Sequence, residues 1–311
     1  MTRLPPLPYP DWEPTKETPH LWAQIVGKVK LASSPPKNHW WHVPLYLDVH
    51  GLTTRLLHGA GATGSRAGTS FEIRFDFASH RLVVETANSE ESFPLVDGLS
   101  VSAFDEQLHA TLGRLGVDVP IVEKPFGVPM TTPFPEDREH ASYDAEAVER
   151  FWRVLDWSAS VLEEFAGWFC GKQSPVHLFW HSLDLALTRF SGRRAPAMPD
   201  ADPVTQEAYG GEVVSFGFWT GDANVREPAY YSYTAPEPAG LRDRPLAPAG
   251  QVRWIELGTG SLAILPYEAV RAADDPRGTL LEFLESAYEA GADAADWDRD
   301  ELVSSWCPPM P

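Results

Sequence analysis

Histidines are the residues of this chain whose type and position are best suited to chemistry. Neutral imidazole binds divalent transition metals, and histidine titrates near neutral pH, so it can also transfer protons. Seven of the ten histidines fall in or beside predicted strands, namely His39, His42, His50, His58, His80, His177 and His181. We take His39, His42 and His177 as candidate ligands of a divalent transition metal or as candidate acid–base groups.

A structural role is the alternative for these histidines. The chain has no HExxH or HxH sequence and no spacing typical of a facial triad. A histidine flanked by Trp and Phe is more often a hydrogen-bonded structural residue or part of a pocket wall. A shared site therefore requires distant histidines, above all His39 and His177, to converge in the fold.

One sequence phrase occurs twice and places these two histidines at equivalent positions. The first copy comprises Gly27-Lys28, Ser34-Pro35, His39, Trp41, Leu45, Leu47 and Thr54-Arg55. The second copy comprises Gly171-Lys172, Ser174-Pro175, His177, Phe179, Leu183, Leu185 and Thr188-Arg189. The same residue types in the same order predict an internal duplication. Equivalent positions of two pseudo-symmetric halves can meet near the axis between them.

Carboxylates and basic residues complete the candidate site. Asp184 interrupts a run of leucines, and a carboxylate in so apolar a strand needs a partner. It is either one member of a structural ion pair with a nearby arginine or a catalytic group, and Glu212 has the same two interpretations. Lys172, Arg189 and Arg193 are candidates for binding an anionic substrate group. A lysine that follows Gly at a helix end can instead simply complement the helix dipole.

Tryptophan is abundant, with twelve residues in the chain. Trp41, Trp180 and Trp219, together with Trp40, could line an aromatic pocket for a substrate. The alternative is that they belong to the hydrophobic core.

The elements that position these residues fall into two halves. Residues 1–17 are predicted to be an extended Pro-rich segment, and residues 18–135 form the first half. Thr18-Pro19 is a typical helix start, and apolar residues at helical spacing follow it. Alternation with period two then predicts an antiparallel meander, followed by a helix over 99–115. The predicted strands of this half are 41–49, 52–57, 71–77 and 82–85.

Residues 136–299 form the second half, and residues 300–311 a C-terminal tail. Asp144 is the predicted N-cap of a helix with a wide aromatic stripe that ends at Gly171. Strands are predicted at 176–187, 213–219, 230–233, 252–257 and 262–265, before a closing helix at 279–290. The fold class is therefore α+β, with two related halves. Each half is a helix, an antiparallel β-meander and a helix, with a pseudo-two-fold internal duplication.

Composition narrows the partners and the compartment. A net charge of −19 disfavours nucleic acid and anionic membrane surfaces as partners. Without a signal-like N-terminus or a long apolar run, a cytoplasmic location is expected. Cys170 and Cys307 are widely separated, which argues against a disulfide framework. The sequence makes no prediction of oligomeric state.

Several motifs carry a resemblance to a known family. They include 18–22 (TPHLW), 38–42 (NHWWH), 140–144 (HASYD), 174–180 (SPVHLFW), 188–193 (TRFSGR), 217–219 (GFW) and 265–268 (LPYE). Together they resemble the bacterial domain-of-unknown-function family 5996 over nearly the whole chain. The chain departs from the family pattern at His181, where the pattern resembles Gly. The resemblance implies kinship but no established activity.

These observations lead to two functional hypotheses. The first is a small-molecule enzyme whose site lies between the halves, with His39, His42 and His177 as ligands or acid–base groups. In this hypothesis Asp184 and Glu212 orient the histidines, and an anionic small molecule is the substrate. The alternative is a non-catalytic module that binds a small molecule or a partner through an aromatic pocket.

Overall fold

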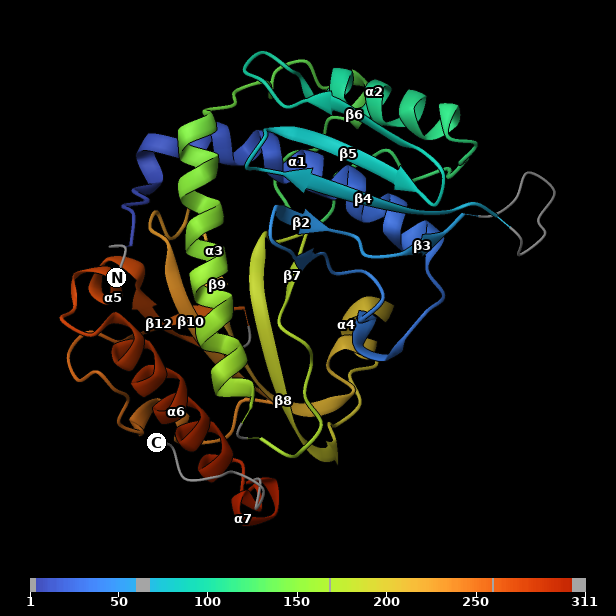
Figure 1. The fold of residues 1–311 in the computed structure, drawn as a ribbon. Coiled ribbons are helices and arrows are strands. Elements are labelled where there is room, and N and C mark those ends of the chain that lie inside the picture. The colour runs from blue at the N-terminus through green and yellow to red at the C-terminus, as the bar shows by residue number, and fades with distance from the viewer. Residues whose placement is uncertain (1–3, 60–67, 168, 259, 304–311) are drawn as a thin grey trace.

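The computed structural model describes residues 4–59, 68–167, 169–258 and 260–303. Cys307 lies outside these ranges. Within them the chain has an α+β fold with two six-stranded sheets whose strand pairs are antiparallel (Figure 1). The α+β class and the antiparallel sheets predicted from the sequence are therefore confirmed.

A 25-residue helix, α1 (Tyr9–Ser33), passes behind the first sheet and α3 in Figure 1. The prediction that it starts at Thr18 is wrong, because the helix already begins at Tyr9 and contains Pro14 and Pro19. A proline inside a helix removes one backbone hydrogen bond, so packing has to offset this loss. Every residue from His20 to Lys30 is buried, which shows that α1 is enclosed on all sides. Its polar residues must therefore find partners in the interior.

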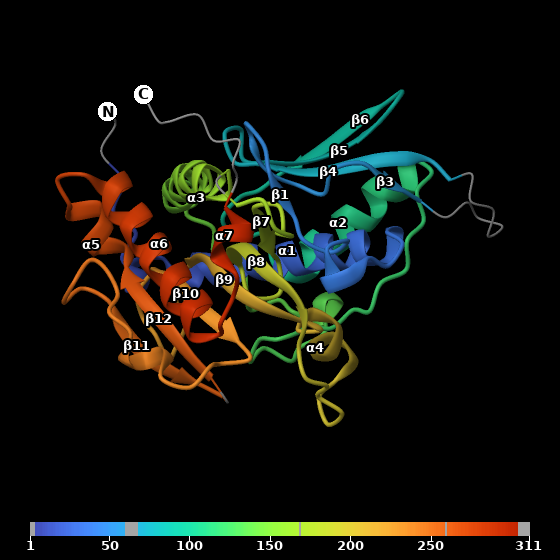
Figure 2. The same ribbon diagram turned by 90° about the horizontal axis from the view of Figure 1, so that it is seen from below.

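The first sheet has the strand order β1-β2-β4-β5-β6, with β3 paired to β4. Its strands are β1 (Tyr46–Leu47), β2 (Gly51–Thr53), β3 (Leu57–His58), β4 (Ser70–Asp76), β5 (Arg81–Thr86) and β6 (Glu90–Pro94). The alternation predicted for 71–77 is confirmed in β4, where buried and partly buried residues alternate. Helices α1 and α2 (Val101–Arg114) cover one face of this sheet (Figure 2). Phe104 of α2 stacks on Trp22 of α1 and on Phe75 of β4.

The second sheet has the strand order β11-β12-β10-β9-β8-β7. Its strands are β7 (His177–Phe179), β8 (Asp184–Arg194), β9 (Gly211–Trp219), β10 (Ala229–Ala235), β11 (Arg253–Leu257) and β12 (Gly260–Pro266). Helix α3 (Ala145–Ala166) begins at the predicted N-cap Asp144 and packs on this sheet through Phe165, which contacts Phe216. Helix α6 (Pro276–Ala294) packs beside it on β9 and β10. The shorter helices are α4 (Pro203–Ala208), α5 (Tyr267–Ala272) and α7 (Arg299–Leu302).

Two predicted strands are wrong in ways that matter for the site. The predicted strand 176–187 is a hairpin, because the chain reverses between β7 and β8, where Leu183 has a φ of 53°. The predicted strand 41–49 is mostly irregular and follows a 3-10 turn at residues 38–40, in which His39 has a φ of 54°. Only Tyr46 and Leu47 of that segment belong to a named strand.

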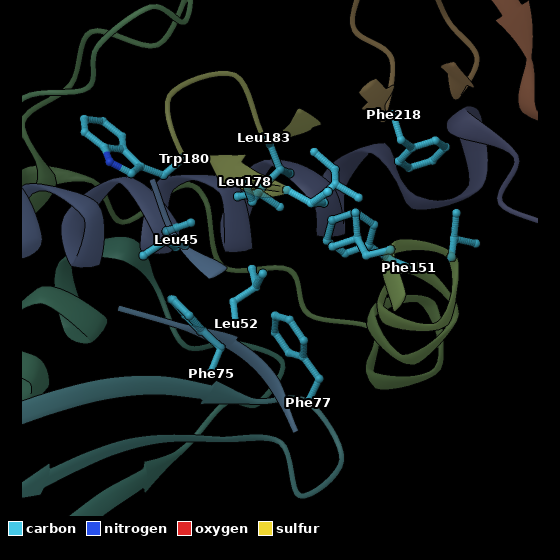
Figure 3. Close-up of a cluster of buried hydrophobic side chains, with 14 of the residues drawn as sticks. Leu45, Leu52, Phe75, Phe77, Phe151, Leu178, Trp180, Leu183 and Phe218 are labelled. Carbon is cyan, nitrogen blue, oxygen red and sulfur yellow. The ribbon is translucent and has the colours of Figure 1, made fainter. Parts of the chain in front are cut away.

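The two sheets meet at Leu45 and Leu178. Each residue donates its backbone N–H to the carbonyl of the other, at 2.9 and 2.8 Å. Trp180 packs against Gly27 of α1 and donates its indole N–H to the carbonyl of Val43. Figure 3 shows side chains of both sheets in one cluster of buried apolar residues. The junction is therefore part of the core, and it draws together the two copies of the repeated phrase.

Candidate functional site

The two repeated phrases meet through His39 and Lys172. The Lys172 ammonium lies 2.6 Å from Nε2 of His39 and donates to it, while Nδ1 of His39 donates to the carbonyl of Ala208 at 3.3 Å. This arrangement requires a neutral imidazole, and burial, followed by the charge of Lys172, lowers the pKa of His39. Helix α3 already ends at Ala166. Lys172 therefore lies beyond the last turn of the helix and does not complement its dipole.

Aromatic rings lie beside the contact between Lys172 and His39. The Lys172 ammonium lies 5.4 Å from the ring centre of Trp41 and 4.7 Å from that of Phe190. The carboxylate of Glu207, in α4, accepts a hydrogen bond from the backbone N–H of His39. Lys172 is exposed, so this pair faces solvent. The predicted site residues His39, Lys172 and Trp41 therefore come together at the surface of the junction.

His177 lies elsewhere in the junction. Its ring contacts Tyr46 and Phe179, and it shares no contact with His39. The side chain is 0% exposed, and among the described residues neither of its ring nitrogens has a hydrogen-bond partner. Burial, reinforced by the charges of Lys30 and Arg55, lowers the pKa of His177 to about 3. The imidazole is therefore neutral and unsatisfied in the interior.

Lys30 and Arg55 make the surroundings of His177 positive. The buried Lys30 ammonium donates to the carbonyl of Thr54 at 2.7 Å and lies 4.7 Å from the ring centre of Tyr46. The Arg55 guanidinium lies 3.5 Å from the centre of the same ring. Burial and then the charge of Arg55 lower the pKa of Lys30 to about 7. Among the described residues, no carboxylate lies within 4.0 Å of either cation.

Three further basic residues belong to the same region. His42 is buried and accepts a hydrogen bond from the backbone N–H of Lys37. Burial, then the charges of Lys37 and Lys30, lower the pKa of His42. Lys28 is also buried, close to Trp180, and burial lowers its pKa. We name Lys30, Tyr46, Arg55 and His177, with His42 at their side, the junction cluster.

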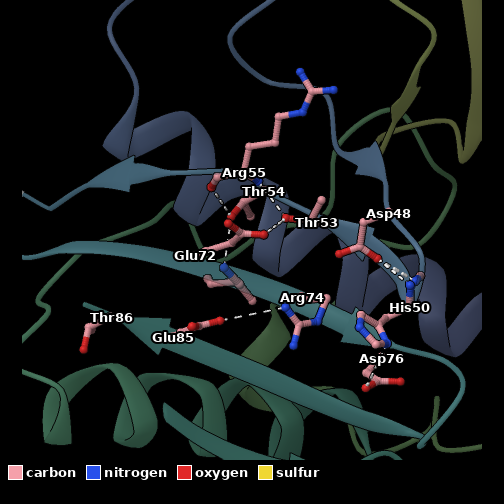
Figure 4. Close-up of polar contacts among 12 residues, drawn as sticks. Asp48, His50, Thr53, Thr54, Arg55, Glu72, Arg74, Asp76, Glu85 and Thr86 are labelled. Carbon is pink, nitrogen blue, oxygen red and sulfur yellow. Dashed lines mark hydrogen bonds and ion pairs between the residues drawn. The ribbon is translucent and has the colours of Figure 1, made fainter. Parts of the chain in front are cut away.

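The acidic groups near the junction cluster are engaged elsewhere. Glu72 accepts a hydrogen bond from Thr53 at 2.5 Å, and Glu85 pairs with Arg74 at 3.9 Å (Figure 4). Figure 4 also shows the Arg55 side chain pointing away from these carboxylates. The charge of Glu72 also acts on Lys30 and raises its pKa, but burial and the charge of Arg55 outweigh this effect.

Asp184 lies apart from the histidines of the candidate site. Its carboxylate accepts a 2.5 Å hydrogen bond from the hydroxyl of Tyr231 and another from Ser182. The arginine partner considered for Asp184 is thus replaced by hydroxyl groups. Glu212 pairs with Arg193 at 2.7 Å, and Arg193 also donates to the backbone after α6. Both Glu212 and Arg193 therefore have structural partners.

The remaining predicted residues occupy separate places. Arg189 is buried between the rings of Phe165, Phe169 and Tyr288 and donates to the carbonyl of Phe165. Trp180 belongs to the core at the junction. Trp219 is partly buried on the opposite face of the second sheet, against a small cluster around Tyr231.

Metal coordination at the histidines gains no support from the geometry. Among the described residues, no three histidine, cysteine or carboxylate side chains lie close enough together to hold a metal ion. His39 already bonds a lysine ammonium, and His42 and His177 lie near Lys30. Positive neighbours of this kind disfavour a cation and favour an anion.

Lys30 and Tyr46 are the members of the junction cluster that sequence reasoning missed. An apolar stripe on a helix normally means one buried face, so a lysine in such a helix is expected on the solvent-facing side. Around Lys30 the helix is buried on every side, and the lysine therefore lies in the interior. Arg55 was part of the repeated phrase without an assigned role. Its place beside Tyr46 now connects that phrase to the cluster.

Comparison with known families agrees with the motifs. Residues 4–304 match a family of unknown function, DUF5996. The chain belongs to this family. The match confirms the resemblance found in the sequence and covers both sheets. No curated protein and no solved structure matches the chain of this DUF5996 member.

One property of the helices is also relevant to partners. In the part of the chain that the structure describes, none of the helices is both long enough and apolar enough to cross a membrane.

Proposed function

We propose that this protein binds a small anionic molecule, with a carboxylate or phosphate group, at the junction cluster. The observation that carries the proposal is His177, a fully buried imidazole with no hydrogen-bond partner among the described residues. An unsatisfied buried polar group costs about 1–3 kcal/mol, so a bound ligand that engages it would remove a destabilising feature.

The charge balance supports an anion as that ligand. The buried Lys30 ammonium donates to a carbonyl and lies against an aromatic ring, and Arg55 lies on the same ring. The positive charge of Arg55 beside the buried Lys30 ammonium raises the cost of burying that ammonium. An anion between them offsets this cost and shifts the pKa of Lys30 back upward. The overall charge of −19 makes this local positive excess more notable.

Arg55 gives the ligand a route to the cluster. It is exposed, whereas Tyr46, Lys30 and His177 are buried. A rotation of the Arg55 side chain away from Tyr46 would open that ring to solvent without moving a strand. An arginine that covers the site when empty can then close over a bound carboxylate or phosphate through a bidentate contact.

Catalysis is a second candidate, and the contact between Lys172 and His39 favours it. The neutral His39 imidazole is placed to accept a proton, and the Lys172 ammonium is placed to donate one. Because both lie at the surface of the same junction, a ligand held by the cluster could be long enough to reach them. In the non-catalytic alternative, the same junction binds a metabolite without converting it.

The test is a binding titration on the full chain. Isothermal titration calorimetry and thermal unfolding should be carried out with sodium phosphate, acetate and succinate, each compared with sodium chloride at equal ionic strength. We expect saturable binding and a raised Tm with at least one of these anions, because ligands that bind the folded state stabilise it. Preference for phosphate over both carboxylates, or the reverse, assigns the chemical class.

Variants locate the binding. Lys30→Met and His177→Phe should abolish the response, while His58→Phe, at an exposed histidine that hydrogen-bonds Ser70, should leave it intact. The proposal is overturned if no anion acts beyond chloride, or if His177→Phe binds as the wild type does. Incubation of the bound anion with the wild type and with Lys172→Met, followed by mass spectrometry, then separates an enzyme from a binding module.

The internal duplication is a further part of the proposal, and the junction supports it. A reciprocal antiparallel pair such as Leu45 and Leu178 has a local two-fold axis at its centre. His39 and Lys172, which touch, are 133 positions apart. The same separation relates Leu45 to Leu178 and the end of α1 at Ser33 to the end of α3 at Ala166.

The order of helices and strands agrees with an alignment of the two halves at this separation of 133 positions. Each long helix is followed by a meander whose first strand, β1 or β7, lies at the junction, and each meander is followed by helices. In this alignment His39 corresponds to Lys172 rather than to His177. A structure-based superposition of residues 9–114 on residues 145–294 tests the duplication. A superposition in which α1 and β1 fail to overlay on α3 and β7 contradicts it.

A further inference from the structure

A cavity lies between the second sheet and its covering helices, apart from the residues of the junction cluster. This cavity of about 200 Å³ is lined by Phe169, Arg189, Glu285, Tyr288, Arg299, Leu302 and Val303. These residues come from the segment after α3, from β8, from α6 and from the α7 region. We propose that this cavity binds a small monocarboxylic acid with an apolar body, through Arg189 and Tyr288.

Arg189 is the charged group of this cavity. Its side chain is 2% exposed, and its guanidinium is stacked between rings, 3.6 Å from the centre of Phe165 and 4.6 Å from that of Tyr288. One terminal nitrogen donates to the carbonyl of Phe165, but Nε has no acceptor among the described residues. No carboxylate within the described ranges lies within 4.0 Å of this guanidinium.

Tyr288 adds a second unsatisfied donor to the same cavity. Its hydroxyl is buried and has no hydrogen-bond partner in the described ranges. An N–H and an O–H that both lack acceptors favour a ligand with two acceptor oxygens, and a carboxylate provides them. Arg299, by contrast, already pairs with Glu289 and Asp293. It adds positive charge to the cavity but is not one of the two ligand-binding residues of the proposal.

The walls and the volume define the rest of the ligand. Phe169, Leu302 and Val303 supply apolar surface opposite the polar groups. A cavity of about 150 Å³ can hold a benzene molecule, so the present volume suits a benzoate-sized acid. Glu285 is the acidic lining residue, and its charge opposes a bound carboxylate. Removing the charge of Glu285 should therefore strengthen the binding of a carboxylate.

The experiment uses benzoate as the probe, with benzyl alcohol and benzylamine as neutral and cationic controls of similar size. Calorimetric titration of the full chain should show benzoate binding more tightly than either control. Tyr288→Phe should weaken benzoate binding about threefold to tenfold, the effect of losing one hydrogen bond. Glu285→Gln should strengthen it, because a like charge is removed.

Two control variants make the result specific. Tyr267→Phe, at a buried tyrosine whose hydroxyl donates to the carbonyl of Pro5, should leave the Kd for benzoate unchanged. Lys30→Met should also leave it unchanged, which separates this site from the junction cluster. The proposal is overturned if benzoate binds no better than benzyl alcohol, or if Tyr288→Phe binds benzoate as the wild type does.

Discussion

Lys172 donates a 2.6 Å hydrogen bond to Nε2 of His39, so a lysine of the second half reaches a histidine of the first. The sequence suggested that the two halves converge through His39 and His177. His39 instead contacts Lys172, and His177 lies inside the junction with Lys30 and Arg55 as its charged neighbours. A surface pair and a buried cluster thus flank the same segment, residues 37–46.

The contact between Lys172 and His39 predicts a pKa change. Replacing Lys172 with Met removes a positive charge that disfavours the imidazolium, so the pKa of His39 should rise. An NMR titration of the histidine ring resonances measures this directly. Lys124→Met, at an exposed lysine elsewhere, is the matched control and should leave His39 unchanged. An unchanged pKa in Lys172→Met would show that the two groups are not in contact in solution.

The packing of α1 against the junction predicts a severe effect of a small substitution. A Cβ atom added at Gly27 would lie 2.3 Å from the ring of Trp180, which is itself buried and fixed by a hydrogen bond to Val43. Gly27→Ala should therefore lower the free energy of unfolding by about 2 kcal/mol or more, the cost of overpacking a core.

Gly113 provides the opposite case in α2. A Cβ added there meets no atom within 4 Å, so Gly113→Ala should be neutral or should stabilise the protein by about 0.5–1 kcal/mol through helix propensity. Urea unfolding of both variants gives the comparison. If the Gly27→Ala and Gly113→Ala variants had equal free energies of unfolding, Trp180 would not pack on Gly27 in solution.

The buried ammonium of Lys30 predicts how stability depends on pH. Its pKa is about 7 in the folded protein and near 10.5 when the chain is unfolded, so the unfolded state binds more protons between these values. The cost of burying the charge is thus full below about pH 7 and declines as the pH rises. Lys30→Met removes this cost but leaves the carbonyl of Thr54 without its donor.

The stability difference between the two proteins is therefore the quantity to measure. Relative to the wild type, Lys30→Met should be most favourable near about pH 6 and should lose that advantage toward about pH 9. Urea unfolding at several pH values, with Lys124→Met as the surface control, provides the data. A difference that stays constant over this range would contradict a lowered pKa at Lys30.

Regular periodicity explains which elements the sequence could predict. The wide aromatic stripe and the Asp144 cap define α3, and strict alternation defines β4. Both patterns are local consequences of one buried face, so they can be read without knowledge of the partner element. The start of α1 could not be predicted, because its prolines are offset by burial on all sides, which is a tertiary effect.

The candidate site was harder to predict because it depends on backbone reversals. Residues 176–187 have apolar residues in phase for one strand, yet Leu183 adopts a positive φ and the chain turns back. That reversal separates His177 from His181 and places Asp184 on a second strand. Likewise His39 has a positive φ in a 3-10 turn, which directs it to Lys172. Neither reversal has a glycine at that position to indicate it.

Asp184 leads to the last prediction, because its partner is a tyrosine rather than the arginine considered from the sequence. Tyr231 is buried and donates a 2.5 Å hydrogen bond to the Asp184 carboxylate. Tyr231→Phe would remove one of the two hydroxyl groups that donate to this buried carboxylate and should cost about 1–3 kcal/mol of stability. In Tyr209→Phe the lost hydroxyl is one that donates to the neutral hydroxyl of Tyr233, so the cost should be smaller.

A double-mutant cycle separates the charge from the packing. If the carboxylate is what makes Tyr231 necessary, Tyr231→Phe should cost clearly less in an Asp184→Asn background, because an amide is neutral and needs weaker compensation. Thermal and urea unfolding of the wild type, both single variants and the double variant give the coupling. If the cost of Tyr231→Phe is the same in both backgrounds, the hydroxyl contributes through packing in the second sheet, and the 2.5 Å contact with Asp184 adds nothing to stability.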